Sequence, residues 1–204
     1  MLRAVIYTII GYLSGSLLFA KYFGTLFQKK DITEQSPDKN PGTFNAFCYG
    51  GFFCGVFTLC GDVIKGFLPV CLYLSDQSAA PYDEGLIFVL SAPVIGHILP
   101  FFHQFRGGKG IAVSFGCLLG LMPELRPLCV LAGTFLFFSL VITITPHCYR
   151  TLLTYGVSVV VMSFLNLRVP VLLGFFIIAG AVTAKHLFGM EEKEKCRVEV
   201  VWRR

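Results

Sequence analysis

The chain has 204 residues, of which 55% are hydrophobic and 15% aromatic, and it carries a formal net charge of +5. A water-soluble domain of this length buries its core with far less apolar material, so the composition argues against a soluble protein. Basic loops beside an anionic membrane leaflet explain the positive charge, and we expect no nucleic-acid partner.

Apolar runs follow one another along the chain, and several reach the about 20 residues that a helix needs to cross a bilayer. A shorter run over 111–122 is interpreted as a half-length or strongly tilted helix. We therefore predict an all-α, polytopic membrane bundle of about seven helices. The longer runs are Val5–Phe23, Gly51–Leu74, Leu86–Phe102, Leu128–Ile144, Thr151–Leu165 and Val169–Phe188.

The first apolar run, which follows Arg3, could also be a cleaved signal peptide. However, Ser14-Gly15-Ser16-Leu17 is a poor cleavage site, and the run continues through Ala20, which is longer than the usual apolar core of a signal. We expect a retained first helix.

The distribution of lysine and arginine predicts the topology, because positive loops stay in the cytoplasm. The loop around 76–84 is acidic and has no basic residue, whereas Arg126, Arg150 and Arg168 hardly discriminate between the two sides. We predict a multi-pass protein of the cell membrane with its N-terminus outside and its active site facing the cytoplasm. Residues 1–190 would form the membrane domain and residues 191–204 a basic cytoplasmic tail. The basic residues that decide the orientation are Lys21, Lys29, Lys30, Lys39, Arg106, Lys109, Lys185, Lys193, Lys195, Arg197, Arg203 and Arg204.

Eight cysteines and four histidines are scattered through the chain without CxxC pairs or zinc-ligand spacing. Buried, reduced thiols that pack as small hydrophobic groups explain the cysteines best. We predict no metal site and no cofactor.

The segment Gly107-Gly108-Lys109-Gly110 interrupts the apolar pattern. An isolated cation at a helix centre costs roughly 2.5–3.5 kcal/mol on insertion scales, so we expect this segment at a membrane edge. Two glycines allow successive amides to turn toward an anion, and a helix that begins there would add its dipole. Lys109 would act as a point charge on a phosphate. A basic flank explains Arg106 but not the glycines, so we predict a phosphate-binding loop, although its spacing is not that of a Walker A loop.

A second polar group lies between residues 31 and 45, where Pro37, Pro41 and Gly42 prevent a regular helix and predict a turn. Asn40 and Asn45 supply amides, but taken alone the segment could be a solvated loop.

Two charges inside the second apolar run, Asp62 and Lys65, lie three positions apart on one helix face and can pair. They would either brace the ends of helices or shape a polar pocket. Ser14-Gly15-Ser16 could be only a close helix contact, and Lys185-His186 is a weak signal by itself.

Taken in order, these motifs resemble the membrane acyl-phosphate–glycerol-3-phosphate acyltransferases, the PlsY family. The resemblance covers essentially residues 4–190, and the segment from Gly96 to Gly110 is its most specific part. The matching motifs are Gly15-Ser16, Asn40-Pro41-Gly42 with Asn45, Asp62 with Lys65-Gly66, and Gly96-His97 through Gly110.

The resemblance implies transfer of a fatty acyl group from acyl phosphate to the sn-1 hydroxyl of glycerol 3-phosphate, which gives lysophosphatidic acid. It also implies that neither acyl-CoA nor acyl carrier protein is the direct donor, and that no covalent acyl-enzyme forms. Electrostatic positioning by preorganised donors would then supply most of the catalysis. The expected partners are both substrates and membrane lipid, with a monomeric protein.

Four positions depart from the family pattern. Asp38 stands where a serine is usual, Phe44 replaces threonine, Cys48 replaces an arginine, and Gly189 replaces an asparagine. We do not assign the family's roles to Asp38, Cys48 or Gly189, and we hypothesise that Lys39 supplies the missing positive charge.

These departures leave two alternatives open: acylation of another phosphorylated acceptor, and a non-enzymatic lipid-phosphate binder or carrier. We predict that Lys109 and His186 are catalytic and that Asp62 and Lys65 shape the pocket. The predicted substrate-binding residues are Ser16, Lys39, Asn40, Gly42, Asn45, His97, Gly107, Gly108 and Gly110.

Overall fold

The computed structural model describes residues 1–28, 31–76, 80, 82–188 and 197–200. Gly189, the loop lysines Lys29 and Lys30, and most of the predicted tail, including Cys196, lie outside these ranges.

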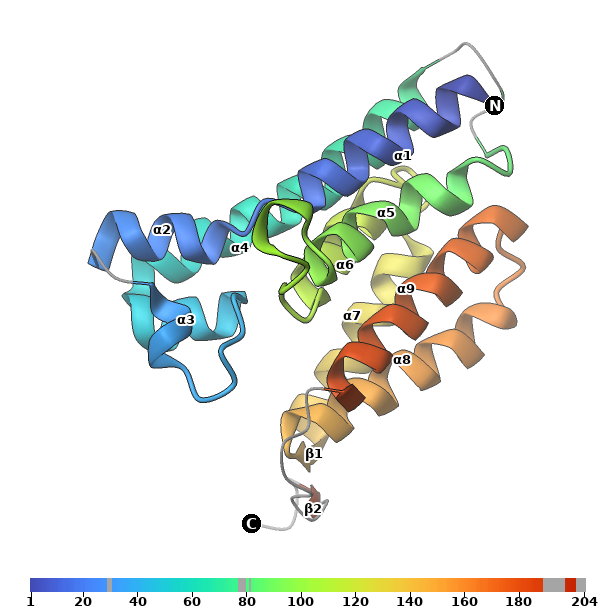
Figure 1. Ribbon diagram of the computed structural model, residues 1–204. Helices are drawn as coiled ribbons and strands as arrows, with labels where there is room; N and C mark the ends of the chain where they lie inside the picture. The colour runs from blue at the N-terminus through green and yellow to red at the C-terminus, as the bar shows by residue number, and fades with distance from the viewer. Residues whose placement is uncertain (29–30, 77–79, 81, 189–196, 201–204) are drawn as a thin grey trace.

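The molecule is a bundle of helices that run side by side (Figure 1). Helices α1 (Leu2–Gly15) and α2 (Phe19–Gln28) lie along the long helix α4 (Thr43–Ser75), and α5 (Leu86–Ile98) packs between α1 and α9 (Val169–Phe188). The other helical elements are α3 (Ile32–Gln35), the 3₁₀ turn η1 (Phe101–His103), α6 (Ile111–Leu119), α7 (Arg126–Leu136), the π-helix η2 (Phe137–Val141) and α8 (His147–Ser163).

Four helical segments of the described chain are long and apolar enough to cross a membrane: Leu2–Gln28, Thr43–Ser75, Leu86–His103 and Val169–Phe188. Arg126–Val141 is a shorter apolar helix. A polytopic helical fold is therefore confirmed, whereas the count of seven helices and the orientation of the termini stay predictions.

The first predicted helix is divided. α1 ends at Gly15, and the backbone of Pro93 approaches this glycine so closely that a Cβ atom would collide with the Pro93 carbonyl group. Gly96 meets the carbonyl of Tyr12 in the same way, so α1 and α5 touch through small residues. The chain resumes as α2 at Phe19.

The segment 31–45 is more regular than we expected. The Asp31 side chain accepts a hydrogen bond of 2.9 Å from the Thr33 amide and so caps the short helix α3. α4 begins at Thr43 and contains a break at Gly51, whose φ of +83° is open to glycine. Pro37, Pro41 and Gly42 lie outside both helices, as we predicted, whereas the short helix α3 before them was not expected.

A small sheet modifies the all-α prediction. Strand β1 (Ile142–Thr145) pairs antiparallel with β2 (Arg197–Val200), with Ile142 opposite Val200. The predicted helix over 128–144 ends at Val141, because the alternating, β-branched sequence Ile-Thr-Ile-Thr favours an extended strand.

The prediction that the cysteines are buried holds only in part. Seven cysteines in the described chain are free thiols; Cys54 and Cys117 are buried, whereas Cys48, Cys60 and Cys129 are exposed. In a helical bundle with membrane-length apolar helices, an outward-facing position suits a small apolar residue as well as the core does.

Candidate active site

The glycine-lysine segment folds back against the end of α5. The amide of Gly108 donates a 3.0 Å hydrogen bond to the carbonyl oxygen of His97. A Cβ atom at Gly107 would collide with that carbonyl, and one at Gly108 would collide with the His97 ring. The glycines are required by close approach, and the Gly108 amide is already bonded, so the expected nest of free amides is wrong at this position.

The left-handed backbone conformation lies at Gly110, with φ of +82°. Gly110 is the N-cap of α6, whose first residue is Ile111, so the helix begins close to Lys109, the condition on which we expected its dipole to contribute. The first-turn amides of an α-helix have no intrahelical acceptor and its dipole favours an anion there. The lysine and this helix end therefore act on the same place.

The buried ammonium group of Lys65 contacts His97, the residue against which Gly107 and Gly108 pack. The Lys65 Nζ atom lies 2.7 Å from a carboxylate oxygen of Asp62, 2.6 Å from the Leu17 carbonyl oxygen and 2.8 Å from His97 Nδ1. Lys65 and Asp62 are each only 2% exposed. Three acceptors use all three donors of an ammonium, which is what a buried charge requires.

The contacts of Lys65 show which parts of the structure the Asp62–Lys65 pair connects. Because the ammonium donates to His97 Nδ1, the ring proton lies on Nε2, the atom that faces the Cα of Gly108. The other carboxylate oxygen of Asp62 accepts a 3.4 Å hydrogen bond from Thr43 Oγ1. The pair is therefore both a brace between helices and the support of the glycine loop.

Lys109 itself is engaged by an acidic residue. Its Nζ atom lies 2.8 Å from one carboxylate oxygen of Asp38, and the other oxygen accepts a 2.7 Å hydrogen bond from Asn45 Nδ2. Burial raises the pKa of Asp38, but the hydrogen bonds from Lys109 and Asn45 outweigh it and hold the pKa below its ordinary value. Asp38 is thus an ionised partner of Lys109 at neutral pH.

The turn before α4 adds an unused acceptor. A Cβ atom at Gly42 would collide with the side-chain nitrogen of Asn40. The Asn40 side-chain oxygen is buried and has no hydrogen-bond partner among the residues that the structure describes. The neighbouring Lys39 is exposed and has a φ of +47°.

Ser16 occupies a closed position. It is fully buried, and its hydroxyl donates to the Tyr12 carbonyl at 2.8 Å and accepts from the Phe101 amide at 3.1 Å. Ser16 thus ties the end of α1 to η1. Substrate binding by this hydroxyl stays a prediction, and it requires the contact with Phe101 to open.

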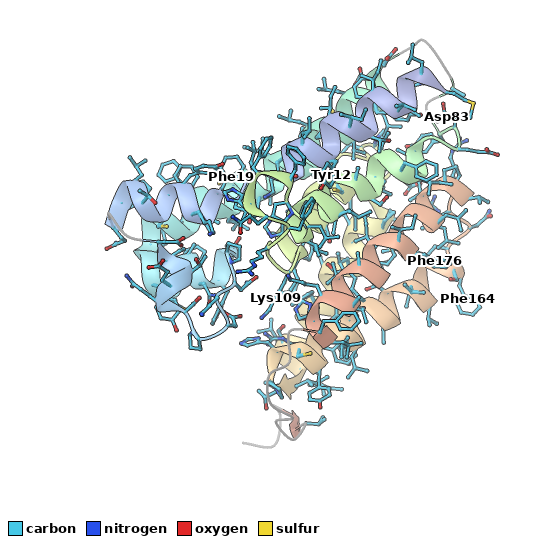
Figure 2. The ribbon with its side chains drawn as sticks, in the orientation of Figure 1. Tyr12, Phe19, Asp83, Lys109, Phe164 and Phe176 are labelled. Atoms are coloured by element: carbon cyan, nitrogen blue, oxygen red, sulfur yellow. The ribbon has the colours of Figure 1, made fainter. Side chains whose placement is uncertain are left out.

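The end of α9 lies on the other side of Lys109, which Figure 2 shows between α3 and the α8–α9 side of the molecule. His186 is buried, and its Nδ1 atom lies 2.9 Å from the Val182 carbonyl oxygen. Since a carbonyl only accepts, Nδ1 carries the proton and Nε2 is left as an acceptor. The charges of Lys109 and Asp38 both act on this ring.

The structure therefore gathers most of the predicted residues from distant parts of the chain. No group of three or more metal-ligating side chains occurs within the described ranges. The residues that converge around the glycine-lysine segment are Asp38, Asn45, Asp62, Lys65, His97, Gly107, Gly108, Lys109, Gly110 and His186.

The start of α8, which also lies here, was missed because the predicted helix began at Thr151. The ring of His147 is 5.4 Å from that of Phe44, and the Cys148 thiol lies 3.6 Å from the His186 carbonyl oxygen. The signal that could have located this helix start is Pro146, because proline is favoured where a helix begins.

A family model described as glycerol-3-phosphate acyltransferase matches residues 5–191. The chain belongs to this family. The match covers all of the helices from α2 to α9 and therefore every residue of the candidate site.

Relatives that carry the same name support the assignment. The chain is 40% identical over 114 residues to a glycerol-3-phosphate acyltransferase of Hahella chejuensis, a match that covers 56% of this chain and 57% of the relative. It is 32% identical over 172 residues to one of Endomicrobium trichonymphae, covering 80% and 84%. The chain spans less than two thirds of the length of several of these relatives.

Two solved structures share the fold over almost the whole chain. Both are of PlsY, an integral membrane glycerol 3-phosphate acyltransferase. The glycerol 3-phosphate form has a TM-score of 0.74 and 25% identity and covers 94% of this chain and 96% of that one. The lysophosphatidic acid form has a TM-score of 0.73.

Proposed function

We propose that this protein transfers a fatty acyl group from acyl phosphate to the sn-1 hydroxyl of glycerol 3-phosphate and so forms lysophosphatidic acid. The observation that carries the proposal is Lys109, a partly exposed cation at the start of α6, held beside a glycine loop whose backbone rests on His97. Both substrates of this reaction carry a phosphate, and the PlsY structures of the same fold include a glycerol 3-phosphate form.

The site suits a reaction that depends on positioning. The acceptor hydroxyl oxygen attacks the acyl carbonyl carbon, the bond between that carbon and the phosphate oxygen breaks, and inorganic phosphate leaves. Lys109 and the first amides of α6 would hold the negative charge that grows on the leaving phosphate. Because acyl phosphate is a mixed anhydride with a good leaving group, strong activation of the hydroxyl is unnecessary.

The proton of the attacking hydroxyl needs an acceptor. A substrate phosphate oxygen serves this role in our proposal, and His186 Nε2, left without a proton by the bond of Nδ1 to Val182, is the protein group placed to assist it. The side-chain oxygen of Asn40 is buried and has no hydrogen-bond partner within the described residues. It would accept a hydrogen bond from a second hydroxyl group of glycerol 3-phosphate and so orient this substrate.

A second candidate function rests on Asp38. Its carboxylate lies on the lysine that would bind a phosphate and repels that phosphate, so an acceptor other than glycerol 3-phosphate fits the same fold. Such an acceptor would carry hydroxyl groups for the carboxylate to bind. Lys39, exposed beside Asp38, would offset the repulsion if glycerol 3-phosphate is the acceptor.

We also propose the finer arrangement that the sequence predicts. The protein acts as a monomer through a membrane domain of residues 1–190, with the tail of 191–204 and the active site facing the cytoplasm. The support is the distribution of basic residues along the chain.

The test is purified full-length protein in lipid, supplied with acyl phosphate and glycerol 3-phosphate. Wild type should form lysophosphatidic acid, and Lys109→Ala should lower the rate by about a hundredfold or more. Arg106→Ala, which removes a cation from the same loop, is the matched control and should stay near wild type. Absence of product from folded wild type would refute the proposal, and a panel of phosphorylated polyols would then identify another acceptor.

Lys39 has its own measurement in the same assay. If Lys39 supplies the charge that offsets Asp38, Lys39→Ala raises the KM for glycerol 3-phosphate while kcat changes little. An unchanged KM would remove Lys39 from the site.

A further inference from the structure

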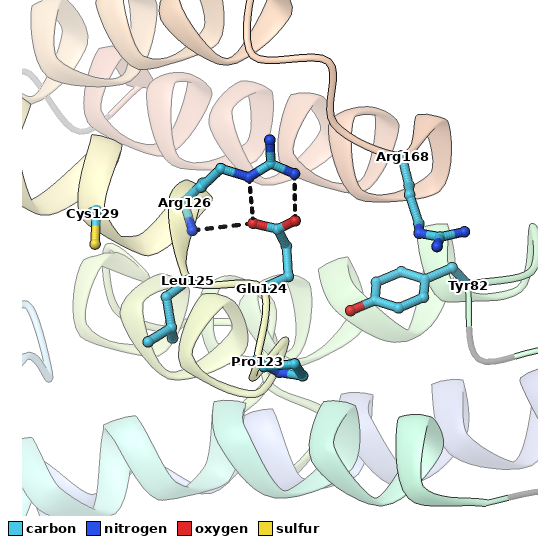
Figure 3. A pocket seen from close by; sticks show the side chains of 7 residues that line it. All are labelled: Tyr82, Pro123, Glu124, Leu125, Arg126, Cys129 and Arg168. Atoms are coloured by element: carbon cyan, nitrogen blue, oxygen red, sulfur yellow. Dashed lines mark hydrogen bonds and ion pairs between the residues drawn. The ribbon is translucent and has the colours of Figure 1, made fainter.

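A hollow with charged side chains in a largely apolar lining lies beside the start of α9 (Figure 3). It is open, with a volume of about 660 Å³, within the range of small-ligand sites. Arg168 stands immediately before α9 and His186 lies near its other end, so the 20-residue helix separates this hollow from the candidate active site. The lining residues are Tyr82, Pro123, Glu124, Leu125, Arg126, Cys129 and Arg168.

One of the two arginines in the hollow is neutralised. Arg126 donates to both carboxylate oxygens of Glu124, at 2.7 Å from Nε and 2.5 Å from the terminal nitrogen, and a further bond of 3.1 Å reaches the Leu165 carbonyl. The hydrogen bonds from Arg126 hold the pKa of Glu124 below its ordinary value, so this carboxylate is ionised at neutral pH. The guanidinium of Arg126 is therefore held in place, and its charge is paired with Glu124.

The other arginine has a free positive charge. The Arg168 guanidinium stacks over the Tyr82 ring at 4.8 Å, and within the described ranges it has no ion-pair partner at salt-bridge distance. Two arginines against one glutamate leave one positive charge in excess in the hollow. A guanidinium whose contact is with an aromatic ring, and not with a carboxylate, keeps N–H groups available for a phosphate.

The surroundings of the hollow are apolar. Leu125, Phe164 and Val169, which lie in or beside the lining segments, are 37%, 84% and 65% exposed. Arginine and tyrosine beside exposed apolar side chains are typical of the membrane–water interface. A ligand in this hollow would therefore have its charged part among the arginines and an apolar part beside Pro123 and Leu125.

We propose that this hollow binds the phosphate group of an anionic phospholipid, with Arg168 as the residue that selects for it. The site is separate from the proposed acyl-transfer centre and does not depend on the acyl-transfer reaction. The excess positive charge favours a lipid with net negative charge over a zwitterionic one, and the apolar rim favours a lipid over free phosphate.

The test is lipid binding by the purified full-length protein, measured by native mass spectrometry during titration with phosphatidylglycerol or phosphatidylcholine. Wild type should retain phosphatidylglycerol preferentially, and Arg168→Gln should weaken that binding by about tenfold. Glu124→Gln frees the Arg126 charge and should strengthen it. Arg106→Gln, the same substitution at the other end of the bundle, should bind as wild type does.

Helix content and melting temperature of each variant establish that it is folded. Equal binding of the two lipids by wild type, or equal loss in Arg168→Gln and Arg106→Gln, would overturn the proposal. Displacement of phosphatidylglycerol by an equal concentration of inorganic phosphate would also overturn it, because it would make free phosphate the ligand.

Discussion

The ammonium nitrogen of Lys109 lies 2.8 Å from a carboxylate oxygen of Asp38, a residue 71 positions earlier in the chain. Asp38 therefore occupies the place beside the lysine that a substrate phosphate needs. A phosphate that binds Lys109 would compete with this carboxylate, since two anions beside one ammonium repel each other. Because of the Asp38–Lys109 ion pair, we expect the affinity for the phosphorylated substrate to depend on which residue stands at position 38.

Replacement of Asp38 by serine should strengthen the binding of glycerol 3-phosphate. The ion pair is partly exposed, and such pairs contribute about 0.2–1 kcal/mol, so the KM should fall by about 1.4- to fivefold. Steady-state kinetics of lysophosphatidic acid formation measures this change.

Asp31→Ser is the matched control, because Asp31 forms a similar partly exposed pair with Lys21 at 3.3 Å. That variant should leave the KM unchanged. A higher KM in Asp38→Ser alone would mean that Asp38 positions Lys109 and Asn45 for substrate instead of competing with it.

Acid should remove the stabilising contribution of Asp38. A carboxylate whose folded pKa is lowered stabilises the protein above its unfolded pKa, here the ordinary 3.8, and the contribution is lost as the pH falls through the folded value. Asp38→Asn should therefore melt at a lower temperature than wild type at neutral pH, and the difference should vanish in acid. A difference that is constant down to about pH 3 would contradict this assignment.

Gly108→Ala should damage the site, because the added methyl group collides with the His97 ring. Overpacking of this kind costs about 1–3 kcal/mol and would displace the loop that carries Lys109. We expect lower kcat and a lower melting temperature. Gly133→Ala in α7 is the control, since nothing lies within 4 Å of the added atom there, and it should be neutral or slightly stabilising.

Lys65→Met should destabilise the protein strongly, by about 3–5 kcal/mol, because it leaves the Asp62 carboxylate buried without its cation. The double variant Asp62→Asn/Lys65→Met removes both charges and should recover much of this loss. Chemical denaturation in detergent measures both. If the double variant is no more stable than the single one, the bonds of Lys65 to Leu17 and His97 outweigh the unpaired charge.

The helices that the sequence predicted best are those whose ends carry a polar signal. α9 spans Val169–Phe188 as expected, since Arg168 precedes it and Lys185-His186 closes it. The break between α1 and α2 was not predictable, because the apolar run is continuous there. It lies beside the contact of Gly15 with the backbone of Pro93, a residue of another helix.

The sequence predicted which residues would form the candidate site, but not the hydrogen bonds and close contacts between them. Spacing on a helix anticipated the Asp62–Lys65 pair, whereas the third acceptor of Lys65, His97 Nδ1, comes from a different helix. The glycines were expected for backbone freedom, but Gly107 and Gly108 are needed because His97 leaves no room for a side chain. Tertiary packing sets these relationships, and one sequence does not encode them in local patterns.

The three acceptors of Lys65 also constrain how the chain enters a bilayer. They come from the α1–α2 connection, from α4 and from α5, and α5 is synthesised last. Until α5 arrives, one ammonium proton has no acceptor, and a buried donor left without an acceptor costs about 1–3 kcal/mol. A nascent chain that stops before residue 86 therefore exposes an incompletely solvated lysine. Insertion of the first two membrane-length segments should therefore become more favourable when the third joins them.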